Sequence, residues 1–230
     1  DSFRLSGDAS ILDELHELAS VLGEARDAEV LAERYRRALD GLSAQLVRGP
    51  VRERLIGGAE DRYRTGLRRS LDSLRSPRYF RLLDRLDALV AESPHAPPDP
   101  KSALAAIEAG EKKVRKAAKA ARRATAEDRD NAIHRIRKRA KRLRYTAAAI
   151  GATRVSDRAK AIQSLLGDHQ DSVVSRAHLD QQAVAAHAAG EDTFTYGLLY
   201  QQESDLARSC RQQLRPALRQ LKQSMHELPS

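Results

Sequence analysis

The chain has 230 residues, a formal net charge of +9 at pH 7 and a composition rich in alanine, leucine, arginine, glutamate and glutamine. Its single cysteine excludes an intrachain disulfide, and no run approaches the roughly 18 apolar residues that a bilayer-spanning helix requires. The alternation typical of strands is hard to find, so we predict an all-α fold. Cys210 follows a helical pattern, where we expect it to pack rather than to act as a nucleophile.

Four helices with apolar stripes are predicted in the first part of the chain. The first stripe begins at Ile11 and is interrupted at Gly23, and a second helix is expected over residues 27–46. A third helix is expected to end at Leu74 and a fourth to begin at Pro77. These elements predict one half of a helical domain.

A proline-rich segment at residues 93–100 holds four of the chain's eight prolines. Such a segment is typical of a connector between packed parts. We therefore predict a single domain with two halves, at about residues 1–92 and 101–230, joined by this connector.

A basic helix is predicted over Glu111–Arg123. Val114 and Ala118 recur on one side of it, and the other side is basic, with Lys112, Arg115, Lys116, Lys119, Arg122 and Arg123. Thr125 with Asp128 three positions on is typical of an N-cap, so another helix is expected to follow at once.

The second helix of this hairpin, Asn131–Ile150, is also strongly basic. Its apolar stripe consists of Ile133, Ile136, Ala140, Leu143, Ala147 and Ile150. Its opposite face carries His134, Arg137, Lys138, Lys141, Arg144 and Tyr145. Like charges at i,i+4 destabilise an isolated helix by about 0.2–0.5 kcal/mol per pair, so we expect an anion to compensate them.

The positive charge of the chain is local. Residues 111–145 hold 15 lysines and arginines against four acidic residues, a surplus of 11, whereas the whole chain is only +9. Most charge runs are solvated surface, but a surplus confined to one hairpin indicates a binding surface. Further helices are predicted over residues 157–166, from Asp171 onwards, and over 192–226, with a kink at Pro216.

An internal repeat appears at an offset of 144 residues. Leu18–Val30 aligns with Ile162–Val174 at five identical positions, and in both segments a glycine is expected to end one helix and an aspartate to cap the next. These residues are Gly23 and Asp27, and Gly167 and Asp171. By the same offset the first-half counterpart of the basic helix would precede Asp1, with only residues 1–6 remaining of it, so we expect further chain upstream.

The motif from His134 to Tyr145, with Leu22-Gly-Glu-Ala-Arg-Asp27 and its weaker echo Leu166-Gly-Asp-His-Gln-Asp171, resembles the CHAD family, the conserved histidine α-helical domain. The resemblance extends over essentially the whole chain. It implies two four-helix bundles, related by a pseudo-twofold axis, around a basic channel that binds inorganic polyphosphate. Members of the family associate with polyphosphate granules. The family's first-half basic helix is missing from this sequence, and with it part of the implied surface.

The resemblance implies that the channel is lined by His134, Arg137, Lys138, Lys141 and Arg144. The other candidates for polyphosphate binding are Arg115, Lys116, Lys119 and Arg123 of the hairpin, and Arg64 and Arg68 of the first half. Arginine forks and lysine point charges suit a chain of phosphates. Exposed arginines are common, so ordinary surface remains the alternative for the first-half pair. For His134 the alternatives are a solvated residue and a hydrogen-bond donor to phosphate that strengthens as pH falls.

No enzymatic motif is evident. The sequence lacks a Gly-x-x-x-x-Gly-Lys-Ser/Thr loop, a Gly-x-Gly-x-x-Gly turn and a Glu-x-Glu-x-Lys motif, so we expect a non-catalytic protein without cofactor or metal. Two alternative functions remain, nucleic-acid binding through phosphates and a helical scaffold that docks an acidic protein. The chain has no tryptophan and few aromatic residues, which disfavours base stacking. We expect a cytoplasmic protein that does not enter membranes.

Overall fold

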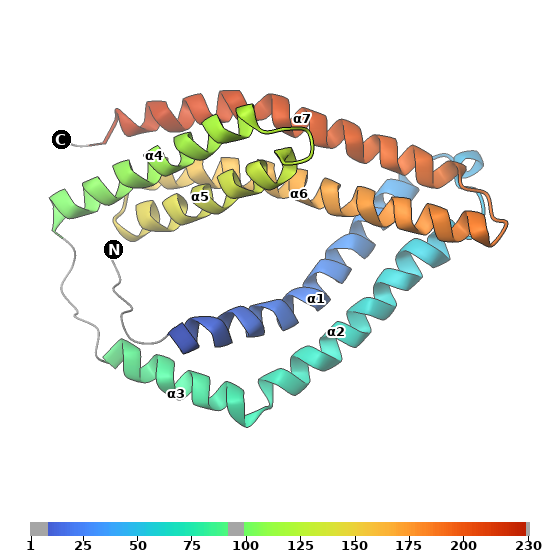
Figure 1. Cartoon of the computed structure of the whole chain (residues 1–230), viewed down its shortest axis with the longest axis horizontal. Helices are drawn as coiled ribbons and strands as arrows, with labels where there is room; N and C mark the ends of the chain where they lie inside the picture. The colour runs from blue at the N-terminus through green and yellow to red at the C-terminus, as the bar shows by residue number, and fades with distance from the viewer. Residues whose placement is uncertain (1–8, 92–98, 229–230) are drawn as a thin grey trace. The chain divides into compact units, whose positions relative to one another are not determined.

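The structure is a computed structural model that describes residues 9–91 and 99–228. These residues form helices and turns, with no strand among them, which confirms the predicted all-α fold (Figure 1). The helices are α1 (Ala9–Asp40), α2 (Gly58–Leu74), α3 (Pro77–Ala91), α4 (Pro100–Arg123), α5 (Arg129–Ala149), α6 (Thr153–Ala188) and α7 (Phe194–Met225). A 3-10 helix, η1 (Ala44–Leu46), and a π-helical segment, η2 (Glu53–Gly57), lie between α1 and α2.

Two long helices correct the prediction that glycine ends a helix in each copy of the repeat. α1 continues through Gly23 and α6 continues through Gly167, so Asp27 and Asp171 lie inside helices and are not N-caps. Glycine costs a helix only about 1 kcal/mol relative to alanine, and tertiary packing of the flanking turns outweighs this.

Chain reversals instead use glycines with positive φ. Gly49, Gly151 and Gly190 have φ of 68°, 74° and 73°, which a residue with a Cβ rarely adopts. Gly151 follows the end of α5, and Gly190 follows the end of α6. The backbone conformation of a glycine, rather than its presence, therefore marks the ends of these helices.

The first of two compact units comprises described residues 9–91 and 181–199. In it α1 packs along α2 (Figure 1). The two helices approach so closely at Gly66 that a Cβ there would lie 2.8 Å from the backbone nitrogen of Ala25. The Thr195 hydroxyl donates to the Leu46 carbonyl and accepts from the Arg48 N–H, both at 2.8 Å. The end of α6 and the start of α7 are thus tied to η1.

The second unit comprises residues 99–180 and 200–228. Parts of α4, α5, α6 and α7 share one hydrophobic core, so this unit is a four-helix bundle. The core includes Ile107 and Val114 of α4, Ile136 and Leu143 of α5, Ile162 and Leu166 of α6, and Leu221 of α7. Asp99 caps α4, since its carboxylate accepts a hydrogen bond from the Ser102 N–H.

The unit boundaries differ from the predicted halves. Residues 181–199 belong to the first unit, although they follow the basic hairpin in the sequence. Most of the predicted connector and the remnant at residues 1–6 lie outside the described residues, and the pseudo-twofold relation stays a prediction. Cys210 is buried, as expected. Within the described ranges, no helix is at once long and apolar enough to traverse a lipid bilayer.

Candidate functional site

The predicted N-cap, Thr125, lies in the turn before α5, and the N-cap residue of the helix is instead Asp128, whose side chain makes no capping hydrogen bond. The Asp128 N–H donates to the Thr125 hydroxyl, and that hydroxyl donates to the Asp128 carboxylate, both at 3.2 Å. The helix proper starts at Arg129. The apolar stripe within α5 is buried as predicted: the exposed fraction is 4% for Ile133 and 0% for Ile136. This burial sets the rotation of α5 about its axis, and the basic residues therefore face fixed directions.

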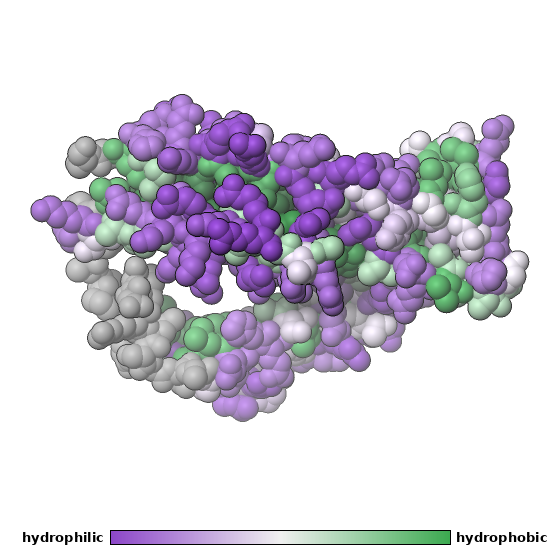
Figure 2. Space-filling model, turned by 45° about the horizontal axis from the view of Figure 1, so that its top comes forward, coloured by the Kyte–Doolittle hydropathy of each residue, from purple (hydrophilic) through white to green (hydrophobic). Residues whose placement is uncertain are grey.

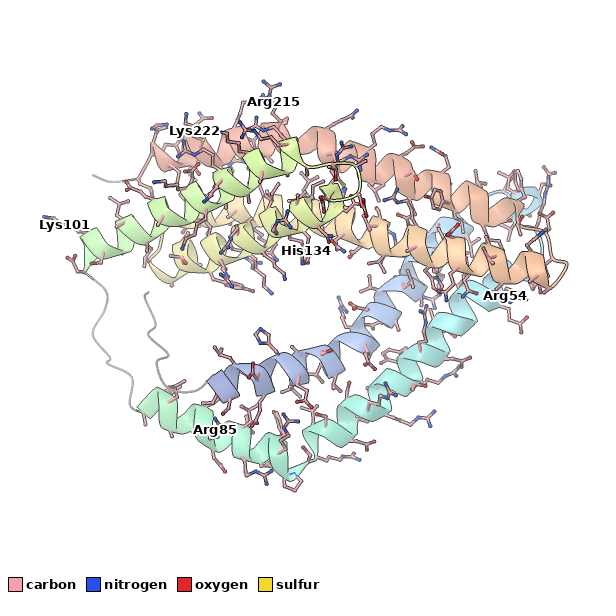
Figure 3. The ribbon with its side chains drawn as sticks, in the orientation of Figure 1. Arg54, Arg85, Lys101, His134, Arg215 and Lys222 are labelled. Atoms are coloured by element: carbon pink, nitrogen blue, oxygen red, sulfur yellow. The ribbon has the colours of Figure 1, made fainter. Side chains whose placement is uncertain are left out.

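Two of the predicted channel residues are half-buried against α6 and are held by uncharged side chains. His134, labelled on α5 in Figure 3, lies within hydrogen-bonding reach of the Gln170 side chain of α6. The Arg144 Nη1 donates to the Oε1 of Gln163 at 3.3 Å. Neither contact neutralises a positive charge, although both restrict the side chain that makes it.

Arg137 lies beside Gly167 of α6. A Cβ on that glycine would lie 3.6 Å from the Nε of Arg137, which is an ordinary van der Waals distance. This Nε is buried and has no hydrogen-bond partner among the described residues, and the same is true of the Nδ1 of His134. Buried polar atoms without partners are uncommon in folded proteins.

The remaining members of the predicted face lie in solvent. Lys138, Lys141 and Tyr145 are exposed, and the Arg144 guanidinium lies 5.4 Å from the centre of the Tyr145 ring. A cation–π contact at this distance orients the guanidinium without neutralising it. We call the set His134, Arg137, Lys138, Lys141 and Arg144 the α5 basic surface.

The charge of α5 has no counterion among the described residues. Seven lysines and arginines lie between Arg135 and Arg144, and none of them forms an ion pair with an acidic side chain of the described ranges. The one acidic residue of α5, Asp130, turns to α6 instead, where its carboxylate oxygens lie 3.6 Å from the His169 ring and 3.7 Å from the Arg176 guanidinium. The positive charge of α5 is thus uncompensated.

His134 has a lowered pKa. Burial is the main cause, the positive charges of Lys138 and Arg137 add to it, and the hydrogen bond to Gln170 opposes it. Its imidazole is therefore neutral at pH 7 without a ligand. A phosphate beside it would favour the protonated form.

The basic residues of α4 border two different features. Lys116, Lys119 and Arg123 are exposed at spacings i, i+3 and i+7, which share a stripe. Arg115 and Arg122 instead line a groove with α7. These two arginines therefore lie at the edge of the predicted basic face that adjoins α7.

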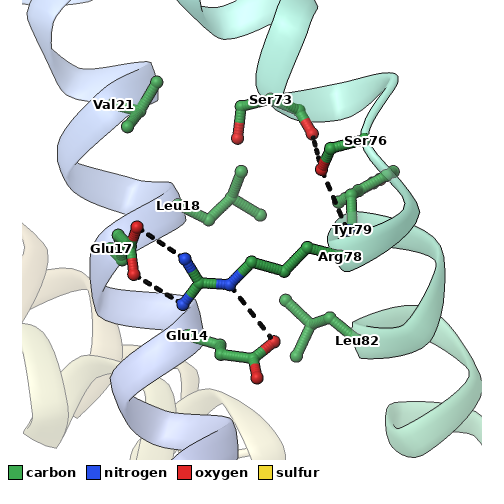
Figure 4. A pocket seen from close by; sticks show the side chains of 9 residues that line it. All are labelled: Glu14, Glu17, Leu18, Val21, Ser73, Ser76, Arg78, Tyr79 and Leu82. Atoms are coloured by element: carbon green, nitrogen blue, oxygen red, sulfur yellow. Dashed lines mark hydrogen bonds and ion pairs between the residues drawn. The ribbon is translucent and has the colours of Figure 1, made fainter.

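The first-half candidates differ in their surroundings. Arg64 pairs with Asp61 at 2.6 Å, whereas Arg68 is exposed. At the start of α3, Arg78 donates to both oxygens of Glu17 at the edge of a small pocket of about 40 Å³ (Figure 4), and these hydrogen bonds lower the pKa of that carboxyl. The role of Arg64 and Arg68 in ligand binding stays a prediction.

Sequence reasoning missed the α6 side of the surface. Gln163, Gly167 and Gln170 recur at i, i+4 and i+7 and form one uncharged stripe beside the basic residues of α5. The absence of acidic residues from that stripe was a usable signal. No group of three potential metal-binding side chains occurs in the part of the chain that the structure describes.

Comparison with known proteins finds relatives of greater length. The uncharacterized proteins MT2285 and Rv2226, from two strains of Mycobacterium tuberculosis, are each 64% identical to this chain over 233 residues. The match covers 99% of this chain and 45% of each relative, so the chain spans about half the length of these proteins. The CHAD domain matches residues 3–180, which include α5 and the uncharged stripe of α6, and this chain therefore belongs to the CHAD domain family.

Proposed function

We propose that this chain binds inorganic polyphosphate through the α5 basic surface, without catalysing a reaction on it. The observation that carries the proposal is the uncompensated charge of α5, whose seven lysines and arginines between residues 135 and 144 have no carboxylate partner within the described ranges. Membership of the CHAD family, which is known in polyphosphate-related proteins, supports the same ligand.

The two kinds of basic residue have different roles in this proposal. Arg137 and Arg144 are half-buried and restrained by α6, so their guanidinium forks lose little freedom when they bind phosphate oxygens. Lys138 and Lys141 are exposed point charges that follow the ligand as it moves. From residue 134 to residue 144 the helix rises about 15 Å, so one polyanion can contact all of them.

The composition of the surface favours polyphosphate over nucleic acid. Tyr145 is the one aromatic side chain next to these cations on α5, whereas single-strand binders stack successive bases on several aromatic residues. We further propose that the same surface brings the protein to polyphosphate granules in the cytoplasm.

The test is calorimetric titration with polyphosphate of defined length at two salt concentrations. The Arg137→Ala/Lys141→Ala variant is expected to lose affinity about tenfold or more, because charge-assisted hydrogen bonds contribute about 1.5–3 kcal/mol each. The Arg154→Ala/Arg208→Ala variant is the matched control, since it removes two exposed arginines of the same bundle. Equal losses in both variants would contradict a site on α5.

Competition separates polyphosphate from nucleic acid. We expect duplex DNA or RNA of equal total charge to displace polyphosphate only at higher concentration. The reason is that the surface contacts phosphate groups and has no set of aromatic residues on which bases could stack. Preferential binding of the nucleic acid would reverse the assignment.

A further inference from the structure

A second basic feature of the bundle lies away from the stripe of α6 described above. α4, the first turns of α5 and the later part of α7 enclose an open groove of about 550 Å³. Its floor is apolar and consists of Val114, Ala118, Ala121, Ile133, Leu214, Leu218 and Leu221. Figure 2 shows hydrophobic surface between hydrophilic ridges in the region of α4 and α7.

The rim of the groove is positively charged on both sides. The basic residues that line it are Arg115 and Arg122 of α4, Arg129 of α5, and Arg211, Arg215, Arg219 and Lys222 of α7. Figure 3 labels Arg215 and Lys222 on α7. Glu111 is the one acidic residue among the lining residues, and its carboxylate lies 3.9 Å from the nearest nitrogen of Arg115. The groove thus combines an apolar floor with an excess of six positive charges.

The spacing of the rim residues follows helix geometry. On α7 they recur at i, i+4, i+8 and i+11 and extend along about 16 Å of the helix. On α4 the two arginines are seven residues, or about 10 Å, apart. The α7 edge therefore offers cations along about three turns of a helix bound in the groove, and the α4 edge along about two.

A polyphosphate chain makes no use of an apolar floor, since it has no apolar surface to bury. An amphipathic helix does, because it places leucine-type side chains at i, i+3, i+4 and i+7 into such a groove. Acidic residues on the two flanks of that helix would meet the cationic edges, as charge complementarity requires.

We propose that the groove between α4 and α7 docks an amphipathic helix of a partner protein that carries an apolar stripe flanked on both sides by acidic residues. The docked helix buries its stripe on Leu214 and Leu218, which are only partly buried in this structure. Its acidic flanks pair with Arg115 and Arg122 on one edge and with Arg215 on the other. This function is separate from polyphosphate binding, because Arg115 is the one residue among the proposed polyphosphate contacts that also lines the groove.

The test uses two fluorescein-labelled synthetic peptides of 15 residues and one composition. One peptide has a leucine stripe with glutamates on both flanks, and the other has the same residues in scrambled order. Fluorescence anisotropy is expected to show at least tenfold tighter binding of the amphipathic peptide by the wild type. Equal binding of the two peptides would overturn the proposal, because it would reduce the effect to net charge.

Variants then locate the peptide. Arg215→Ala/Arg219→Ala removes exposed residues of the rim and is expected to weaken amphipathic-peptide binding at least fivefold, whereas the control Arg154→Ala/Arg208→Ala changes it less than twofold. Leu218→Ser, checked for folding by circular dichroism, is expected to reduce the preference over the scrambled peptide. Unchanged binding in Arg215→Ala/Arg219→Ala would overturn the assignment, whatever the behaviour of the floor variant.

Polyphosphate titration of the same variants keeps the two functions distinguishable. Arg137→Ala/Lys141→Ala is expected to lose polyphosphate binding and to keep peptide binding. Arg215→Ala/Arg219→Ala is expected to do the reverse. If the rim variant instead lost polyphosphate affinity as strongly as the α5 variant, the groove would be part of a polyanion site and the docking proposal would fail.

Discussion

The arginines of the first unit and the basic residues of α5 are alike in type and differ in their neighbours. In the first unit Arg36 pairs with Glu60 at 2.9 Å, and Arg54 donates to both oxygens of Glu191. On α5 the half-buried cations face glutamine and glycine. Arginine content therefore does not distinguish a structural ion pair from a binding surface, whereas the residue opposite each arginine does.

Supplying α5 with counterions is expected to have the largest effect. The variant Gln163→Glu/Gln170→Glu would place carboxylates next to Arg144 and His134. The α5 basic surface would then have carboxylate partners, as the arginines of the first unit do. We expect polyphosphate affinity to fall about tenfold or more, because the ligand must displace charge-assisted hydrogen bonds. Calorimetric titration measures this effect. The control Gln212→Glu/Gln223→Glu adds the same charge at exposed positions of α7, and an equal loss there would refute the explanation.

Replacing one glycine in each unit by alanine is expected to change the free energy of unfolding in opposite directions. Gly66→Ala would place a Cβ 2.8 Å from the Ala25 nitrogen, a backbone atom that cannot move away, and is expected to destabilise the chain by about 1–3 kcal/mol. Gly167→Ala adds its Cβ at 3.6 Å from Arg137 in a helix interior, and is expected to stabilise it by about 0.5–1 kcal/mol. Urea unfolding measures both variants, and a gain in stability for Gly66→Ala would contradict the close approach of α1 and α2.

The buried histidine of α6 is expected to make stability depend on pH. Burial lowers the pKa of His169, Arg211 of α7 and Arg176 of α6 act in the same direction, and Asp130 of α5 opposes them. The unfolded state therefore binds more protons below about pH 6.5. The free energy of unfolding decreases as pH is lowered through this range, by at most about 1.4 kcal/mol per pH unit.

The measurement is the free energy of unfolding between pH 7 and pH 5. His169→Gln is expected to have a shallower slope than the wild type. The exposed His187→Gln is the control and should keep the wild-type slope. A His169→Gln variant with an unchanged slope would assign the acid sensitivity to other groups.

The smallest expected effect is the pH dependence of binding. Because the pKa of His134 is lowered in the free protein and a phosphate would raise it, binding takes up a proton, and affinity rises as pH falls from 8 toward 6. We expect an increase of about two- to threefold, well below the tenfold limit that one pKa unit sets. His134→Ala should remove this increase. Equal pH profiles for His134→Ala and the wild type would leave the imidazole without a role in binding.

The sequence by itself determined the helical fold class, the extent of the basic helix and the rotation of its apolar stripe. Ile136 and Leu143 are buried where the helical period places them, and Thr125 forms hydrogen bonds with Asp128, three residues on, in the turn before α5. These features depend on periodicity and on hydrogen bonds over three or four residues, which the order of residues specifies directly.

Only the tertiary structure decided how the helices continue and what each charge faces. Gly23 and Gly167 were expected to end helices, but the packing of the neighbouring turns outweighs a local cost of about 1 kcal/mol. Likewise, Arg115 turns to the groove with α7, and Arg137 meets a glycine that is 30 positions away in the sequence. Such partners are brought together by burial of the core, so no local pattern on either helix specifies them.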